Sequence, residues 1–150
     1  MKTPQCSIKK MCGVTLIELL YVVAILGILA SVAIPSFSQQ MKRDRLVSNA
    51  NQLHSIFKFA RSEAAKRDSA VLLNETAGDW QVRLAGNTLQ TFSPTHNSIS
   101  VTGLADLQIT GSGETTQSNY LINDGDSATT DYCLRVLPSG QSFLINTNAC

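Results

Sequence analysis

Charge is scarce in this sequence of 150 residues, and histidine is scarcer still. Charged residues make up 15% of the chain, and the formal net charge at pH 7 is only +1. This composition excludes a long disordered polyelectrolyte and lacks the overall basic balance of a nucleic-acid-binding protein. The two histidines, His54 and His96, are far apart and have no Cys or Ser motif beside them. We therefore expect no catalytic residues, no metal cluster and no cofactor.

Charge is almost absent from one long apolar segment near the N-terminus. From Val14 to Ile34 the only polar side chains are those of Thr15, Glu18 and Ser31. This length is sufficient to cross a bilayer. A secretory signal peptide has a shorter apolar core, of about 7 to 15 residues, and a small-residue cleavage site after it. No such site follows here, so hydropathy alone predicts a membrane anchor with a domain outside the membrane.

Glu18 is not explained by a plain membrane anchor. A carboxylate one turn inside an apolar membrane helix costs about 2.5–3.5 kcal/mol on insertion scales, so it needs a partner or a proton. Cleavage after Gly13 would give Val14 a new α-amino group four residues before Glu18, on the same helical face. A second copy, shifted along the helix axis, could then offer its amine to this carboxylate.

The segment around Glu18 also carries a specific motif. Residues 9–20 read KKMCGVTLIELL, with a glycine, a glutamate five residues later and an apolar run that continues to Pro35. This order resembles the class III signal of type IV pilins and type II secretion pseudopilins. Two positions depart from that pattern, because Val14 stands where Phe is usual and Cys12 where a basic residue is common. Neither departure removes the glycine or the glutamate, and we expect slower processing at worst.

The resemblance implies how the chain is processed and divided. A prepilin peptidase would cleave after Gly13 and methylate the new amine of Val14. The parts would be a leader (1–13), a transmembrane and filament-core helix (14–34), an amphipathic helix (35–67) and a β-rich periplasmic part (68–150). The expected fold is α+β and pilin-like, with the long N-terminal helix packed on a mostly antiparallel sheet.

The residues beyond Pro35 predict the same helix independently. Apolar or small residues recur at the 3-and-4 spacing of an amphipathic helix, at Leu46, Ala50, Leu53, Phe57, Ala60 and Ala64. The helix should continue to about Arg67. Pro35 cannot donate a hydrogen bond to the carbonyl of Ser31, so we expect a kink or a loosened turn there.

The remainder of the sequence predicts short strands joined by polar loops. Alternating or β-branched runs cover 70–73, 80–84, 107–109, 132–137 and 142–145. Pro138-Ser139-Gly140 lies between the last two runs and predicts a hairpin. The helix end at Ala60–Ala64, followed by a strand, resembles the minor-pilin branch named for GspH and FimT, which includes FimU-like proteins.

The cysteines agree with a head outside the cytoplasm. Cys6 and Cys12 would be discarded with the leader, which leaves Cys133 and Cys150 as one pair in the mature chain. An even pair across the membrane indicates a disulfide bond in the periplasm. Closing this short loop would stabilise the fold by about 3 kcal/mol in the chain-entropy model. The alternative is two unrelated thiols.

Two further features are weighed as ligand sites. The segment 124–131 holds Asp124, Asp126 and Asp131, but its sixth position is Thr129 where a calcium loop of the EF-hand type needs glycine. A solvated loop, with no metal, is expected.

DNA-uptake receptors of the FimT branch carry a Gly-Arg-x-Arg motif near the C-terminus. The corresponding segment 140–143 reads GQSF and lacks both arginines. The four basic residues of the helix end, Lys58, Arg61, Lys66 and Arg67, could still form a strip. A solvated face, or contacts with acidic neighbouring subunits, is the expected role of that strip. No DNA-binding residues are assigned.

These inferences predict a minor pilin, a non-enzymatic subunit in which Glu18 sets the register of assembly. It would lie in the inner membrane with its head in the periplasm and then pass into a type IV pilus at the cell surface, supporting twitching, adhesion or DNA uptake. Its partners would be other major and minor pilins and the prepilin peptidase. The alternatives are a type II secretion pseudopilin, a DNA-binding competence receptor and a signal-anchored envelope protein.

Overall fold

The computed structural model describes residues 15–103 and 106–150, which form one long helix followed by eight strands. The helix α1 spans Leu16–Arg67. Two compact units divide between Phe37 and Ser38. The second unit, Ser38–Cys150, is called the head unit below, and it includes the C-terminal half of α1 together with all of the strands.

A specific backbone motif ends α1 at the predicted residue. Asp68 has a left-handed conformation, with φ of 47°. The N–H of Ser69 then donates to the carbonyl of Ala64 at 3.2 Å, which is the long hydrogen bond of a Schellman motif. Lys66 and Arg67 in the last turn also carry the charge that the helix C-terminus favours. The predicted helix end near Arg67 is confirmed.

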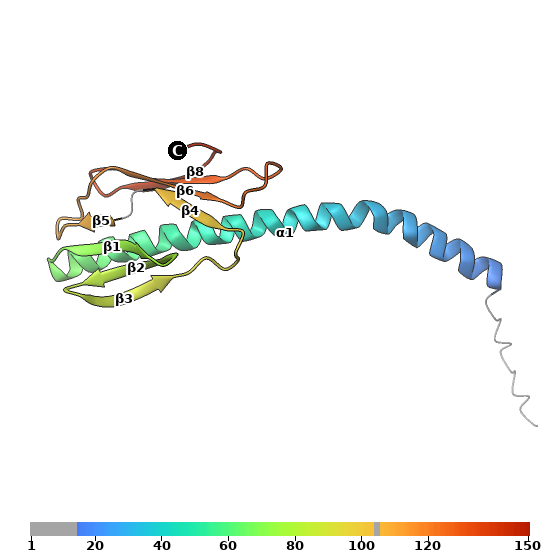
Figure 1. Ribbon diagram of the computed structural model, residues 1–150, viewed down its shortest axis with the longest axis horizontal. Coiled ribbons are helices and arrows are strands. Elements are labelled where there is room, and N and C mark those ends of the chain that lie inside the picture. Colours follow the sequence, from blue (N-terminus) through green and yellow to red (C-terminus); the bar gives the residue numbers. More distant parts are fainter. Residues whose placement is uncertain (1–14, 104–105) are drawn as a thin grey trace, which may run out of the picture. The chain divides into compact units, whose positions relative to one another are not determined.

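The strands form two antiparallel sheets of four strands each. The strands are β1 (Val71–Thr76), β2 (Asp79–Leu84), β3 (Asn87–Phe92), β4 (Ser100–Gly103), β5 (Asp106–Ile109), β6 (Ser118–Asn123), β7 (Tyr132–Val136) and β8 (Ser142–Asn146). The first sheet has the order β3-β2-β1-β5 and the second β4-β6-β7-β8. Figure 1 shows β1, β2 and β3 on one side of the C-terminal half of α1, with β4, β6 and β8 on the other. The predicted α+β class and the β7–β8 hairpin are confirmed, whereas β3, β4 and β6 were not predicted.

The core of the head unit lies between α1 and the two sheets. All six residues of the predicted helical stripe are buried, and Leu53, Phe57 and Ala60 have no exposed surface. Burying a large apolar side chain contributes about 1.5–3 kcal/mol, so this stripe attaches the helix firmly to the sheets. Across the core the rings of Trp80 and Tyr120 meet edge to face, with centroids 5.0 Å apart. Burial raises the pKa of Tyr120 to about 12, so its hydroxyl stays protonated.

One buried polar residue on α1 was not predicted. Asn49 has no exposed surface, yet each of its polar atoms has a partner. Its Nδ2 donates to the carbonyl of Arg45 and to Oγ1 of Thr95, at 2.7 and 2.9 Å. Its Oδ1 accepts from the N–H of Thr95 at 3.0 Å. Satisfied in this way, the amide adds no unpaired buried group and ties the loop after β3 to the helix.

A disulfide bond joins Cys133 to Cys150, as predicted. The Cα atoms are 5.5 Å apart, within the range that disulfides require. Cys133 lies on β7, so the bond attaches the C-terminal residues to the second sheet and encloses the β7–β8 hairpin.

Two turns meet beside the last part of α1, and one arginine connects them. Arg61 donates from Nε to the carbonyl of Gly113 and from a terminal nitrogen to that of Ser139, both at 3.3 Å. The turns approach so closely that a Cβ on Gly140 would overlap the Gly113 carbonyl oxygen. Only glycine fits at Gly140, because its φ of 72° is also in the left-handed region.

This contact predicts a large loss of stability for Gly140→Ala. Gly125 provides a matched control, because its φ is 71° and a Cβ there would meet no atom within 4 Å. Gly125→Ala should cost about 1–2 kcal/mol for the left-handed conformation alone, and Gly140→Ala about 2–5 kcal/mol because the clash is added. Denaturant unfolding of a fragment that begins at Ser38 would measure both. Equal losses for the two variants would contradict the close contact.

Candidate functional site

The apolar part of α1 that precedes the head unit is the first candidate site. Large hydrophobic side chains from Leu16 to Phe37 are exposed, and the most apolar part of the helix contains no residue buried within the chain. This part of α1 is long and apolar enough to cross a membrane. Apolar surface on this scale is stable only against lipid or against other protein.

Glu18 lies in the first turn of α1, on this exposed segment. Thr15 caps that turn: its Oγ1 accepts from the N–H of Glu18 at 3.3 Å, and its carbonyl accepts from the N–H of Leu19 at 3.1 Å. The order Thr-x-x-Glu is itself a helix-start pattern, and sequence reasoning missed it. The helix dipole favours an acid at this position, but among the described residues no basic side chain forms an ion pair with Glu18.

The other residues predicted for this segment have different outcomes. Gly13 and Val14, the predicted cleavage and methylation positions, lie outside the described residues. Pro35 lies inside α1, and the helix continues on both sides of it. The predicted kink at Pro35 stays a prediction.

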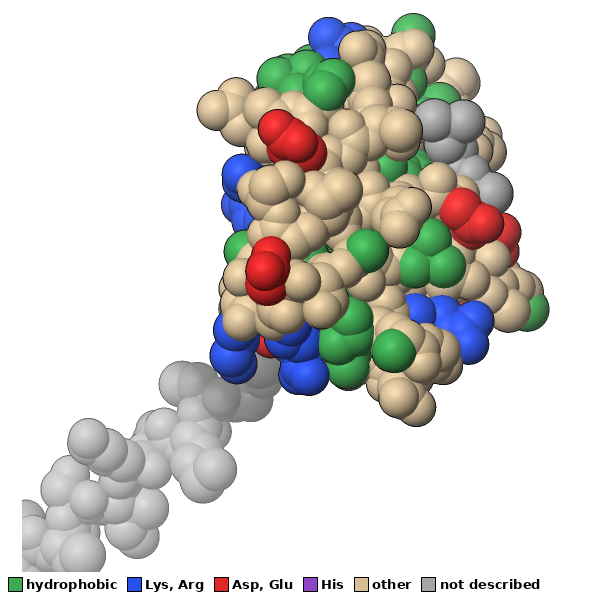
Figure 2. Space-filling view, turned by 90° about the vertical axis from the view of Figure 1, so that its left-hand side faces the viewer, with side chains coloured by type: hydrophobic (Ala, Val, Ile, Leu, Met, Phe, Trp, Pro, Cys, Tyr) green, Lys and Arg blue, Asp and Glu red, His purple; other side chains and the backbone are tan. Residues whose placement is uncertain are grey.

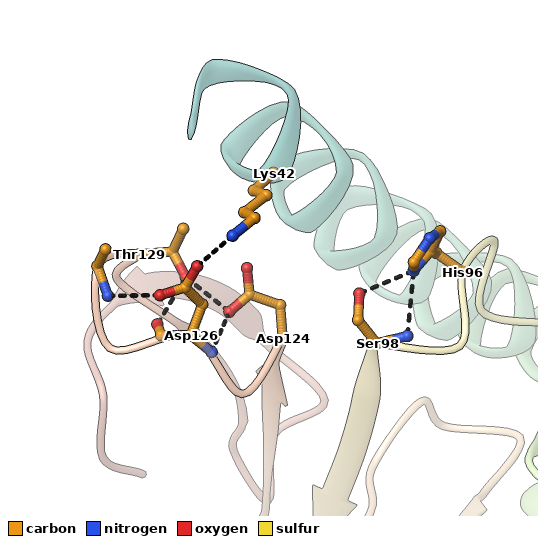
Figure 3. Close-up of polar contacts among 7 residues, drawn as sticks. Lys42, His96, Ser98, Asp124, Asp126 and Thr129 are labelled. Carbon is orange, nitrogen blue, oxygen red and sulfur yellow. Dashed lines mark hydrogen bonds and ion pairs between the residues drawn. The ribbon is translucent and has the colours of Figure 1, made fainter. Parts of the chain in front are cut away.

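A second polar site lies in the loop between β6 and β7. The ammonium of Lys42, on α1, contacts Oδ2 of Asp126 at 2.6 Å. Figure 3 shows the lysine side chain reaching from the helix to this loop. Asp124 supports the loop from within, because its Oδ1 accepts from the N–H of Asp126 and from Oγ1 of Thr129. The hydrogen bond and charge of the partner raise the pKa of Lys42 and lower that of Asp126.

This geometry satisfies both oxygens of Asp126, whereas Oδ2 of Asp124 is buried without a hydrogen-bond partner among the described residues. Asp126 uses one oxygen on Lys42 and the other on the N–H of Ala128. Within residues 15–103 and 106–150 no group of three His, Cys, Asp or Glu side chains is arranged to hold a metal ion. The cation beside this loop is the Lys42 ammonium.

The two histidines form separate local contacts. His54 Nε2 lies 2.9 Å from Oγ of Ser142 on β8, and burial together with the nearby charge of Lys58 lowers the pKa of His54. His96 contacts Ser98 within its own loop at 2.8 Å, as Figure 3 shows. The structure therefore does not bring the histidines together.

The predicted basic strip is partly neutralised within the chain. Glu63 pairs with Arg67 at 2.7 Å and with Lys66 at 3.9 Å. Arg61 is held by the two turn carbonyls. Figure 2 shows separate blue and red groups on a largely uncharged face of the head unit. Nucleic-acid recognition favours a continuous basic surface, which this face does not present.

A long apolar helix that ends in an α+β head is the architecture of pilin-like proteins. Comparison with protein families agrees with this class: the model of the type II transport protein GspH matches residues 49–140. Because that match covers more than half of the chain, the chain belongs to the GspH family. The prokaryotic N-terminal methylation motif matches residues 8–34, and this motif implies processing by a prepilin peptidase. A search of curated protein sequences found no match.

Solved structures show the same fold. The type IV minor pilin FimU of Pseudomonas aeruginosa PAO1, in one crystal form, matches with a TM-score of 0.61 and 18% identity over 69% of this chain and 90% of FimU. A second crystal form of FimU gives a TM-score of 0.58 and 18% identity over 67% and 92% of the two chains. The apolar helix, the methylation motif and this fold describe a membrane-anchored pilin-like chain with a separate head.

The Lys42–Asp126 contact predicts a defined pH dependence of head-unit stability. The lowered pKa of Asp126 means that its contribution is present above the usual value of 3.8 and is lost as the pH falls through the folded value. The raised pKa of Lys42 means that its contribution to the stability of the head unit is fully present below pH 10.5. This contribution is lost only as the pH rises through the higher pKa of the folded state. Asp126→Asn should therefore lower the unfolding midpoint of the Ser38–Cys150 fragment across the whole interval between these limits.

The matched control is Asp44→Asn, since Asp44 accepts from Gln40 on the same helix and has no lysine partner among the described ion pairs. The difference between wild type and Asp126→Asn should shrink as the pH falls through the lowered pKa of Asp126 and be absent once that carboxylate is protonated. A difference that persists unchanged in acid would show that the carboxylate charge is not its source.

Proposed function

We propose that this chain is a minor pilin, a structural subunit that enters a type IV pilus. Prepilin peptidase would cleave between Gly13 and Val14 and methylate Val14. The segment 14–34 would hold the chain in the inner membrane, with the head in the periplasm, until the subunit enters the filament. The chain would then lie at or near the pilus tip or take part in the start of assembly.

The observation that carries this proposal is the contrast along α1. From Leu46 onward one side of the helix is buried in the head unit, whereas the segment up to Phe37 is exposed along its full length. A surface that lipid covers before assembly can be covered by the equivalent helices of neighbours afterwards. Both environments are apolar, so the hydrophobic effect does not favour one over the other. Close helix packing and polar contacts would therefore decide how the subunits assemble.

Glu18 supplies the polar contact in this proposal. Its carboxylate would meet the Val14 amine of a neighbouring subunit shifted along the filament axis. An unpaired carboxylate in the apolar layer costs about 2.5–3.5 kcal/mol, so a neighbour in the correct register is favoured over one that is misplaced. The described residues supply no ion pair for Glu18 within its own chain, which supports an external partner.

The family match favours one further candidate, a pseudopilin of a type II secretion system. Both candidates use the same N-terminal processing and the same helix, so the two are separated by phenotype. Deletion of the gene should reduce surface pili if the chain is a minor pilin. Retention of exported enzymes in the periplasm, with normal pili, would instead support the pseudopilin role.

Cleavage is tested first by the intact mass of the protein. In cells with prepilin peptidase the mass should correspond to residues 14–150 plus one methyl group, and without the peptidase to the uncleaved chain. Gly13→Val should block cleavage, whereas Gly27→Val, a matched change where an added Cβ meets no atom within 4 Å, should not. A wild-type chain that keeps residues 1–13 in a host that trims its other prepilins would exclude the pilin proposal.

Glu18→Gln tests the register contact without changing the size of the side chain. The variant should remain in the membrane at normal levels, because a neutral amide is cheaper there than a carboxylate. Its amount in sheared pili should fall about tenfold or more, since the ion pair is lost. Glu75→Gln, the same change at an exposed position near the end of β1, should have no effect. Normal incorporation of Glu18→Gln would count against the proposed register role.

A further inference from the structure

β8 is the last strand of its sheet, so only one of its edges is paired. Two backbone hydrogen bonds at the ends of the hairpin fix its pattern. The N–H of Leu137 donates to the carbonyl of Gln141 at 2.8 Å, and the N–H of Thr147 donates to that of Asp131 at 2.9 Å. In an antiparallel ladder, residues that exchange such bonds alternate with residues that do not.

The alternation identifies the backbone groups that β8 leaves free. Ser142, Leu144 and Asn146 fall between the bonded positions, so their N–H and C=O groups point away from β7. Natural edge strands commonly carry a charge, a proline or a bulge that prevents further pairing. The sequence of β8, SFLIN, has no charge and no proline, and its pairing with β7 shows no register shift. β8 is therefore an unprotected edge that can accept another strand.

One face of α1 runs beside this edge. Arg43 and Val47 line a hollow with Asn146 at one end of β8, and Lys58 and Arg61 line another with Phe143 at the other end. Ser142 also lines the hollow near Lys58, and its 2.9 Å contact with His54 connects the helix to the strand. The helix face and the edge together are called the β8 groove below.

The end of the β8 groove near Lys58 selects for negative charge. This hollow, with a volume of about 610 Å³, is lined by Lys58 and Arg61 and by no acidic side chain. Lys58 is exposed and has no hydrogen-bond or ion-pair partner among the described residues, in contrast to Lys66 and Arg67, which share Glu63. Phe143, which is partly exposed, adds apolar surface to the same hollow.

We infer that the β8 groove is a docking surface for an extended segment with an acidic side chain, contributed by a neighbouring subunit. The segment pairs with Ser142, Leu144 and Asn146 as a fifth strand, and its carboxylate lies beside Lys58 and Arg61. Backbone pairing gives affinity in this mode, and side-chain hollows give specificity. The identity of the neighbour as a filament subunit rests on the proposed function, whereas the chemistry of the groove does not.

The test uses the full chain in cells that assemble filaments. The photoreactive residue p-benzoylphenylalanine replaces Phe143 in the β8 groove or, as a control, the exposed Gln90 on β3 at the edge of the other sheet. After irradiation, sheared filaments should contain a crosslink from position 143 to an extended, acid-containing segment of another subunit. The control at position 90 should not reach that segment.

Charge reversal then tests the electrostatic part. Lys58→Glu should reduce this crosslink about tenfold, because like charges then face each other. Lys66→Glu, the same change away from the groove, should leave it within about twofold. Changing the partner's crosslinked acid to lysine should restore the yield with Lys58→Glu. Asn146→Pro removes an edge N–H that β7 does not use, so it should lower the yield while the head unit stays folded.

Three results would overturn the inference. Crosslinks from position 143 only within the same chain or to lipid would show that no neighbour enters the groove. A nuclease-sensitive product would show that nucleic acid, not protein, occupies it. A crosslink yield unchanged by both Lys58→Glu and Asn146→Pro would contradict both the charge contact and the strand pairing. If the chain is absent from sheared filaments, the proposed function fails. The docking role of the β8 groove is then tested separately, by measuring the same crosslink in the membrane fraction.

Discussion

Burial of one side of the C-terminal half of α1 is the constraint from which the rest of the structure follows. Leu46, Leu53 and Phe57 occupy the space between two sheets that are not hydrogen-bonded to each other. Without the helix, the inner faces of both sheets would be exposed to water. The helix is therefore the centre of the head unit's core, and the strands cover it from two directions.

This arrangement explains how one helix serves two environments. The residues that precede the head unit have no strands to cover them, so their apolar surface must be covered by lipid or by other helices. Here the residues on both sides of the unit boundary at Phe37 belong to one helix, so the anchor and the core share a backbone.

The sequence was sufficient for the elements with strong periodicity. The helical stripe from Leu46 to Ala64 and the hairpin around Pro138-Ser139-Gly140 could be predicted because spacing and turn residues are local signals. β4 was missed because it is only four residues long and partly exposed, and β3 because its polar side chains show no alternation. β6 does alternate, at Ser118, Tyr120 and Ile122, and this signal could have been used.

The candidate site was predictable only where its residues are close in sequence. Glu18 could be identified because the acid interrupts an apolar run, and Thr15 could have been found from the same four residues. The contact between Lys42 and Asp126 joins residues 84 positions apart, and nothing in either local sequence specifies the other. The same limit applies to Arg61, whose two acceptors are backbone carbonyls that any residue carries.

The covalent link between Cys133 and Cys150 restricts what β8 can do with a neighbour. Strand exchange between identical chains requires the exchanged element to leave its own sheet on a free stretch of backbone. When the disulfide bond is formed, residues 133–150 make a closed covalent ring. β8 lies within this ring and pairs with β7, which carries Cys133. The strand can therefore receive a neighbour along its outer edge, but it cannot be donated to another subunit while the ring is intact.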